Sequence, residues 1–306
     1  MSPLGGEGAR DCRAQVRVGQ DAAWGKAAAP VSQPESGQPV LLSTITREPF
    51  QPVRLYYSIP SRTFVFARLD ALECVVEAPE ERCWHWLFHA ESASIQFEGC
   101  GYDDVPVERR PIILGRLRFP KSGGMVLETN SFVRALAGAR YFAPLLGEKI
   151  TARRCRVLNR FCAGSDGTAG PELFKLLDQN VTVIDPRVAE ERLRRQLKGA
   201  RTTEELERRV AAAQAERQAR GEDVPMVEDF PLAPEEETPG FRNLENTLQL
   251  RLLRAAAHWG GDTTVMVESL IYELVRKGSL RGDGVRRECP DEIVGFVDQP
   301  GCGAVD

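Results

Sequence analysis

The fold is organised around one stretch, Cys83-Trp84-His85-Trp86-Leu87-Phe88-His89-Ala90-Glu91. It holds two of the four tryptophans and two of the three histidines of the chain. In an extended segment, successive side chains point to opposite faces of the sheet. The aromatic residues then share one face, and a thiol, two imidazoles and a carboxylate share the other. The pattern predicts a core strand with a polar face that is a candidate site.

A first β-hairpin is predicted just before this stretch. Leu72, Cys74 and Val76 alternate with other residues, and a turn rich in proline and glutamate, at 79–81, leads into Cys83. Upstream, residues 64–76 suit two readings. They form either a short helix capped by Ser61 or Thr63, or a further extended segment.

A second hairpin is predicted at 112–127. Two apolar runs flank Pro120-Lys121-Ser122-Gly123-Gly124, a loop composition that is typical of hairpins. Between the two hairpins, Ile95 and Phe97 alternate and predict a short strand.

Helices and strands alternate after the second hairpin. A helix is predicted from Ser131 to Leu146, capped by Asn130 or Ser131 and ended by Gly147. A strand follows at 150–161, then a helix at 171–177 and a β-branched strand at 181–184. Hairpins followed by this mixed order predict an α+β fold, an antiparallel hairpin sheet packed with helices.

Composition divides the chain into a core and flanking segments. The core domain is expected at 53–186. The other segments are a disordered N-terminal tail (1–52), charged helices (187–220), an acidic proline-rich linker (221–240), a helical hairpin (241–278) and an irregular C-terminal tail (279–306).

The composition excludes some functional classes. The first 20 residues lack the apolar core of a secretory signal, and no run approaches the roughly 18 apolar residues of a membrane span. We therefore expect a cytoplasmic protein with no membrane contact. The eight cysteines contain no C-x-x-C pair, so no structural zinc site and no cofactor are expected.

The polar face of the tryptophan stretch is the sharpest candidate metal site. Its possible ligands are Cys83, His85, His89 and Glu91. Strand geometry weakens this hypothesis, because His85 and His89 would lie roughly 13 Å apart at 3.3 Å per residue. A half-buried strand with hydrogen-bonded polar residues is the simpler interpretation.

Arginines on two predicted strands form a candidate nucleic-acid interface. They are Arg116 and Arg118 on one face of the first strand, and Arg154, Arg156 and Arg160 on the second. Guanidinium groups on a sheet beside aromatic residues suit phosphate backbones and single strands. Nearby acidic residues such as Glu128 could instead pair with them across strands.

No catalytic motif stands in a supporting context. The chain lacks phosphate loops, a nucleophile elbow and the zinc-protease motif, and it has only three histidines. The first expectation is therefore a non-enzymatic, intracellular interaction or regulatory protein whose helical C-terminal region binds a protein partner or a second copy. The first alternative is nucleic-acid binding through the arginines, and the second is a carboxylate-dependent enzyme.

Overall fold

The computed structural model describes most of the chain. The described residues are 40–97, 100–147, 150–164, 171–200, 202–220, 224–232 and 242–279. Residues 1–39 of the predicted N-terminal tail and 280–306 of the predicted C-terminal tail lie outside them.

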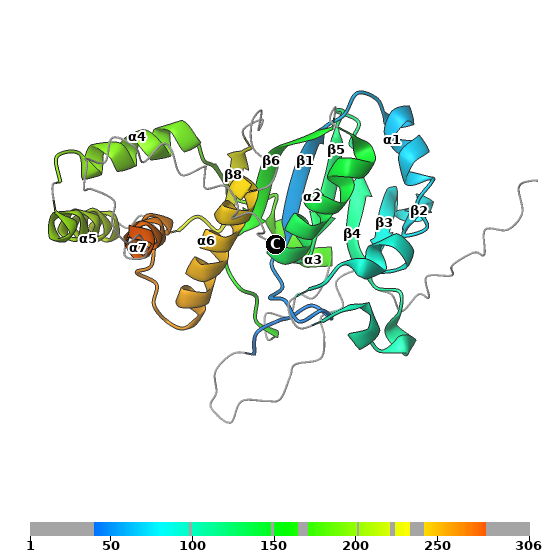
Figure 1. The fold of residues 1–306 in the computed structure, drawn as a ribbon, viewed down its shortest axis with the longest axis horizontal. Helices are drawn as coiled ribbons and strands as arrows, with labels where there is room; N and C mark the ends of the chain where they lie inside the picture. Colours follow the sequence, from blue (N-terminus) through cyan, green and yellow to red (C-terminus); the bar gives the residue numbers. More distant parts are fainter. Residues whose placement is uncertain are drawn as a thin grey trace, which may run out of the picture.

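A single eight-stranded sheet forms the centre of the molecule (Figure 1). Its strands are β1 (Val53–Ser58), β2 (Val75–Ala78), β3 (Cys83–Leu87), β4 (Ile113–Arg118), β5 (Met125–Thr129), β6 (Thr151–Leu158), β7 (Val181–Val183) and β8 (Val227–Pro231). Their order is β2-β3-β4-β5-β1-β6-β8-β7. All neighbours are antiparallel except β7 and β8, which run parallel.

Helices surround this sheet, so the predicted α+β class is confirmed. The α-helices are α1 (Arg62–Leu69), α2 (Phe132–Leu146), α3 (Pro171–Leu176), α4 (Pro186–Leu197), α5 (Thr203–Ala219), α6 (Arg242–Trp259) and α7 (Val267–Ser279). Short 3-10 turns are η1 (Pro79–Glu81), η2 (Ala90–Ser94), η3 (Tyr102–Asp104) and η4 (Val107–Arg109). Of the two readings left open at 64–76, the helix holds for its first part, since Ser61 caps α1 by accepting the Phe64 N–H.

One face of the sheet carries the main core. Helices α2 and α6 pack on this face, where Leu55, Leu117 and Leu127 are buried (Figure 1). Helix α2 comes close to the sheet at Gly138, where an added Cβ would lie 2.7 Å from the Leu127 side chain. Glycine at this position therefore lets α2 pack closely against the strands.

The tryptophan strand is central to this core. Trp86 is fully buried and stacks on Tyr141 of α2, with ring centroids 5.6 Å apart. Trp84 faces the same side, as its alternation predicts. However, β3 ends at Leu87, earlier than the predicted stretch, and η2 begins at Ala90 after two intervening residues.

The opposite face is apolar at one end only. There α3 and the segment 40–50 cover a second apolar cluster that includes Leu87, Leu158 and Val227. This corrects the prediction of a disordered tail over 1–52. Within that range, residues 40–52 lie against the fold, and Leu42 and Phe50 are buried.

Two further expectations differ from the structure. The predicted acidic linker at 221–240 contains β8, a strand inside the sheet, between β6 and β7. The expected strand at Ile95 and Phe97 is reduced to an isolated bridge between Phe97 and Cys100.

The predicted helical segments are present, but one is not free for a partner. Helices α4 and α5 occupy the charged region at 187–220, and α6 and α7 form the hairpin at 241–278. Helix α6 buries Leu244 and Leu248 in the main core of its own chain. Helices α4, α5 and α7 lie beyond the β8 side of the sheet (Figure 1), where Arg217 of α5 pairs with Glu268 of α7 at 2.7 Å.

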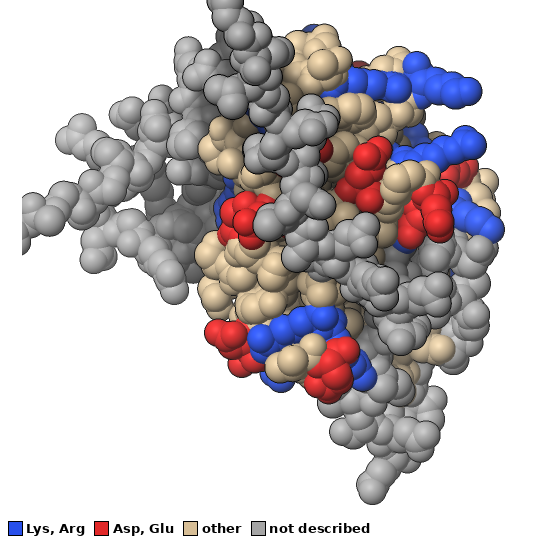
Figure 2. All heavy atoms as spheres, turned by 90° about the vertical axis from the view of Figure 1, so that its right-hand side faces the viewer, with Lys and Arg blue, Asp and Glu red and all other residues tan. Residues whose placement is uncertain are grey.

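The surface near α1 and β2 is mixed in charge. Figure 2 views the molecule from this side and shows basic and acidic side chains interspersed. This side therefore shows no broad basic patch among the described residues. Within those residues, no helix combines the length and the apolarity needed to cross a membrane.

Candidate functional site

Strand register gathers polar side chains into one row on the second face of the sheet. The row has six residues, one from each of six neighbouring strands. Strand pairing places each residue opposite the next, so all six point to the same face of the sheet. From β3 to β8 the row is His85, Arg116, Glu128, Arg54, Arg156 and Asp229. The row borders the apolar cluster under α3.

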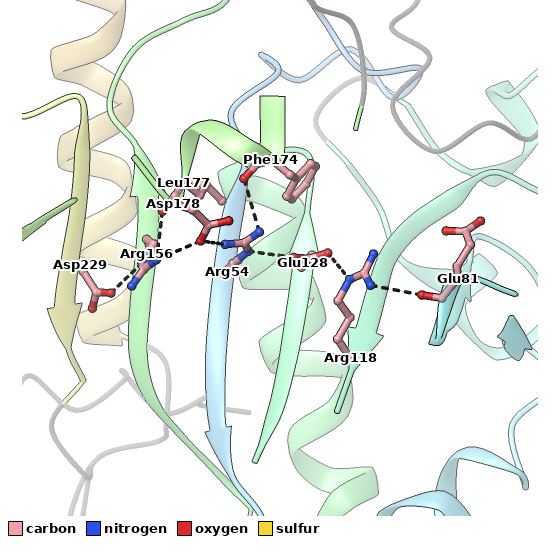
Figure 3. Close-up of polar contacts among 9 residues, drawn as sticks. All are labelled: Arg54, Glu81, Arg118, Glu128, Arg156, Phe174, Leu177, Asp178 and Asp229. Carbon is pink, nitrogen blue, oxygen red and sulfur yellow. Dashed lines mark hydrogen bonds and ion pairs between the residues drawn. The ribbon is translucent and has the colours of Figure 1, made fainter. Parts of the chain in front are cut away.

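Seven residues in and beside this row form a continuous chain of alternating charge, which we call the charged ladder. Its members, in order of contact, are Arg118, Glu128, Arg54, Asp178, Arg156, Asp229 and Arg154. Figure 3 shows the contacts from Asp229 to Arg118. The ladder begins and ends with arginine.

The carboxylates of the ladder each bind two guanidinium groups. Glu128 accepts from Arg54 Nε and Arg118 Nε, both at 2.8 Å. Asp229 accepts from Arg156 Nε at 2.7 Å and lies 3.4 Å from Arg154 Nε. Such charge-assisted contacts fix the guanidinium planes.

The loop after α3 closes the middle of the ladder. Asp178 accepts from Arg54 Nη1 at 2.6 Å and from Arg156 Nη1 at 3.3 Å. The backbone carbonyls of Phe174 and Leu177 accept from the same two arginines (Figure 3). Burial acts to lower the pKa of Arg54, but Asp178 and Glu128 outweigh it and raise that pKa above its ordinary value.

The two ends of the ladder are its open arginines. The side chains of Arg118 and Arg154 are 38% and 46% exposed, whereas those of Glu128 and Asp229 are 6% and 2% exposed. Four arginines and three carboxylates leave the ladder with a net charge of 4 − 3 = +1. A ligand in solvent therefore meets guanidinium groups at both ends.

An aromatic ring lies between these ends. Strand register places Arg118 opposite Val126, Val126 opposite Tyr56, and Tyr56 opposite Arg154. The Arg154 guanidinium stacks over the Tyr56 ring, 4.1 Å from its centroid. The three strand spacings from β4 to β6 separate the two arginines by roughly 14 Å.

A second polar cluster adjoins the ladder at β3. Glu81, Cys83 and His85 place their ligand atoms within 4.8 Å of one another. Glu81 also binds Arg116 Nη2 at 2.9 Å. Burial lowers the pKa of Arg116 to about 10 and raises the pKa of the Cys83 thiol to about 11.

The structure divides the four predicted metal ligands. Cys83 and His85 lie together, but His89 and Glu91 follow the end of β3 and take other roles. His89 precedes η2 as its N-cap, and Glu91 accepts the backbone N–H groups of Glu73 and Cys74 at 3.0 Å. Glu81, from the preceding turn, takes their place in the cluster.

The structure brings four of the five predicted arginines onto one face. Arg116 and Arg118 of β4 and Arg154 and Arg156 of β6 share it, because β5 and β1 join these strands in register. Arg160 lies beyond the end of β6 and is exposed. The sequence did not point to Arg54 and Asp229 on this face or to Asp178 on the loop after α3. Glu128 pairs with arginines across strands, which is the alternative that the sequence left open.

The buried carboxylates of the described residues are all engaged with arginine. Besides Glu128 and Asp229, Glu48 lies 3.7 Å from Arg134, and Glu228 binds Arg251 and Arg254. Each of these four carboxylates therefore lies within ion-pair distance of at least one arginine. This arrangement gives the expectation of a carboxylate-dependent enzyme no support.

Comparisons with protein-family models, with curated protein sequences and with solved structures find no match to this chain. The sheet face that carries the charged ladder, which we call the charged face, is therefore the basis for a functional proposal.

Stability should depend on pH through His85. Burial lowers the pKa of this imidazole below its ordinary value, although Glu81 opposes the shift. As the pH falls below about 6.5, the unfolded chain binds a proton that the folded chain does not, so the free energy of unfolding should decrease. Urea unfolding at about pH 7.5 and about pH 5.5 measures this loss. The loss should be smaller in His85→Gln. An equal loss in the wild-type chain and the variant would show that His85 does not cause this pH dependence.

Proposed function

We propose that the chain binds single-stranded nucleic acid on the charged face of its sheet, along Arg118, Tyr56 and Arg154. The observation that carries the proposal is that the charged ladder ends in two half-exposed arginines on either side of an aromatic ring. The protein acts here as a binding module, with no chemical step.

The inner carboxylates position the two outer arginines for a ligand. Glu128 holds Arg118 through Nε, and the Glu81 carbonyl accepts from its Nη1 at 3.3 Å. Arg154 faces Asp229 through Nε and rests on Tyr56. A guanidinium group held on one edge keeps its other N–H groups directed outward, and its planar donors suit phosphate oxygens.

The ligand class follows from the ring and the charge. Unpaired bases stack on exposed aromatic rings and on guanidinium planes, which favours a single strand over a duplex. Asp178, the exposed acidic member of the ladder, reaches it from the loop after α3, on the opposite side of the row from Tyr56. Because the ladder carries a charge of only +1, few phosphates are expected to contribute.

Variants at the three contact positions test the proposal. We expect Tyr56→Ala to weaken binding of a fluorescent single-stranded oligonucleotide by about 1–3 kcal/mol per stacked base, measured by fluorescence anisotropy. Arg118→Gln and Arg154→Gln should also weaken binding. Arg140→Gln is the matched control, because Arg140 is similarly exposed at 53% and ion-paired to Glu245, but lies on α2.

The outcome that would contradict the proposal is specific. Wild-type chain that does not bind at low salt, where phosphate contacts are strongest, would exclude it. Equal loss in Arg140→Gln and Arg118→Gln would show a general charge effect without a site on the sheet.

Self-association is a second candidate, favoured by two exposed valines. Val183 on the edge strand β7 is 74% exposed, and Val188 on α4 is 58% exposed. Exposed edge strands pair with other chains, and lysine on the edge prevents this. Analytical ultracentrifugation should then show a dimer that Val183→Lys dissociates. A wild-type chain that is monomeric at high concentration would exclude this candidate.

A further inference from the structure

The cluster at the start of β3 has the dimensions of a metal site. His85 Nε2 lies 3.4 Å from Glu81 Oε2, and Cys83 Sγ lies 4.0 Å from the same oxygen. All three ligand atoms fall within 4.8 Å of one another. One tetrahedral zinc ion with bonds of about 2.0–2.3 Å needs ligand separations of about 3.3–3.8 Å. Shifts of less than about 1 Å would bring the three atoms to one ion.

Two of these groups are held on the strand itself. Cys83 and His85 lie two residues apart on β3, so they face the same side, and both are buried. His85 Nε2 is buried and makes no hydrogen bond within the described part of the chain. A buried polar atom without a hydrogen bond calls for an explanation, and a bound ion is one.

Glu81 completes the set from the hairpin turn. It ends η1, and Arg82 then adopts a left-handed conformation with φ of 53° before β3 begins. This conformation turns the chain tightly, and the Glu81 carboxylate lies beside the two strand residues.

We infer that Glu81, Cys83 and His85 form a zinc-binding site, whether or not the chain binds nucleic acid. A thiolate, an imidazole and a carboxylate are the donors that zinc prefers. Three protein ligands leave the fourth tetrahedral position for water or another ligand, as in sites that are open to solvent. When zinc binds, the Cys83 thiol loses its proton to solvent and the thiolate bonds to the ion.

Arg116 competes with the ion in the metal-free protein. Its Nη2 lies 2.9 Å from Glu81 Oε2, the oxygen that would bind zinc. A guanidinium group beside a cation opposes binding, so removing it should help. Arg116→Gln is therefore expected to bind zinc more tightly than the wild-type chain.

Metal titration of the full chain tests the site. Chain stripped of metal with a chelator should bind one zinc ion in calorimetry. With cobalt as a spectroscopic substitute, it should show intense tetrahedral bands and a thiolate-to-cobalt charge-transfer band. Cys83→Ser should abolish the charge-transfer band, and Glu81→Gln and His85→Gln should weaken zinc binding at least roughly 10- to 100-fold.

Control variants separate this site from the other thiols. Cys100→Ser, which removes another buried thiol, should leave both measurements unchanged. Glu81 is 41% exposed, so Glu81→Gln tests the site without altering the core, and circular dichroism of each metal-free variant checks folding. A charge-transfer band that survives Cys83→Ser, or unchanged zinc affinity in Glu81→Gln, would overturn the inference, as would the absence of zinc binding in the wild-type chain.

Discussion

Replacing Trp86 with alanine is expected to lower the free energy of unfolding by about 3–5 kcal/mol. Trp86 is fully buried and contacts both Tyr141 and Phe142 of α2, with centroids 5.6 and 5.3 Å away. Alanine would leave a cavity between the sheet and the helix that packed neighbours fill only in part. Urea unfolding followed by circular dichroism measures the loss.

Trp259→Ala is the matched control for this prediction. Trp259 ends α6, is only half-buried and lies 6.2 Å from the Phe161 ring. Because less apolar surface is lost there, its effect should be clearly smaller. If the two variants lose equal free energy of unfolding, the buried contacts of Trp86 with α2 do not contribute more to stability than those of Trp259.

Glu128→Gln is expected to destabilise the fold by about 1.5–3 kcal/mol, because two arginines lose a charge-assisted partner while Arg54 keeps Asp178. The substitution keeps the size of the side chain but removes the negative charge between Arg54 and Arg118. Arg54 is only 14% exposed, so its charge would lose one carboxylate partner in a poorly solvated position. The same unfolding experiment gives the change in free energy.

The exposed pair on the helices provides the comparison. Glu245→Gln removes the partner of Arg140, but both side chains are about half exposed, so the loss should stay within about 1 kcal/mol. A Glu128→Gln variant as stable as Glu245→Gln would mean that the charged ladder is not a stabilising part of the sheet.

Alternation along single strands was the reliable signal in the sequence. It placed Trp84 and Trp86 on the core face, and it placed Arg116 beside Arg118 on one side of their strand. These patterns are local, because the period of two depends only on strand geometry. Arg118 and Arg154 share one face because of the order of the strands in the sheet, and local alternation does not predict that order.

The strand β8 shows why composition misled. Its Glu228 and Asp229 look like parts of a solvated acidic linker, yet both are buried. Arg251 of α6 binds Glu228, and Arg156 of β6 binds Asp229. A strand buried on both faces is normally apolar. These two carboxylates are buried because arginines that are distant in the sequence pair with them, and composition does not reveal such pairs.

Arg54 was missed for a related reason. It alternates with Val53 and Leu55 in β1, so its strand could have been predicted from the period of two. Its place at the centre of the ladder follows from the pairing of β1 with both β5 and β6. Glu81 likewise belongs to a turn in the sequence and reaches the β3 cluster only through the hairpin.

The salt dependence of single-strand binding tests nucleic-acid binding on the charged face most directly. If Arg118 and Arg154 each meet one phosphate, the logarithm of the binding constant should fall against the logarithm of salt concentration with a slope of about −1.4. In the double variant Arg118→Gln/Arg154→Gln, the slope should approach zero. An unchanged slope in the double variant, or no binding by the wild-type chain, would contradict the proposal.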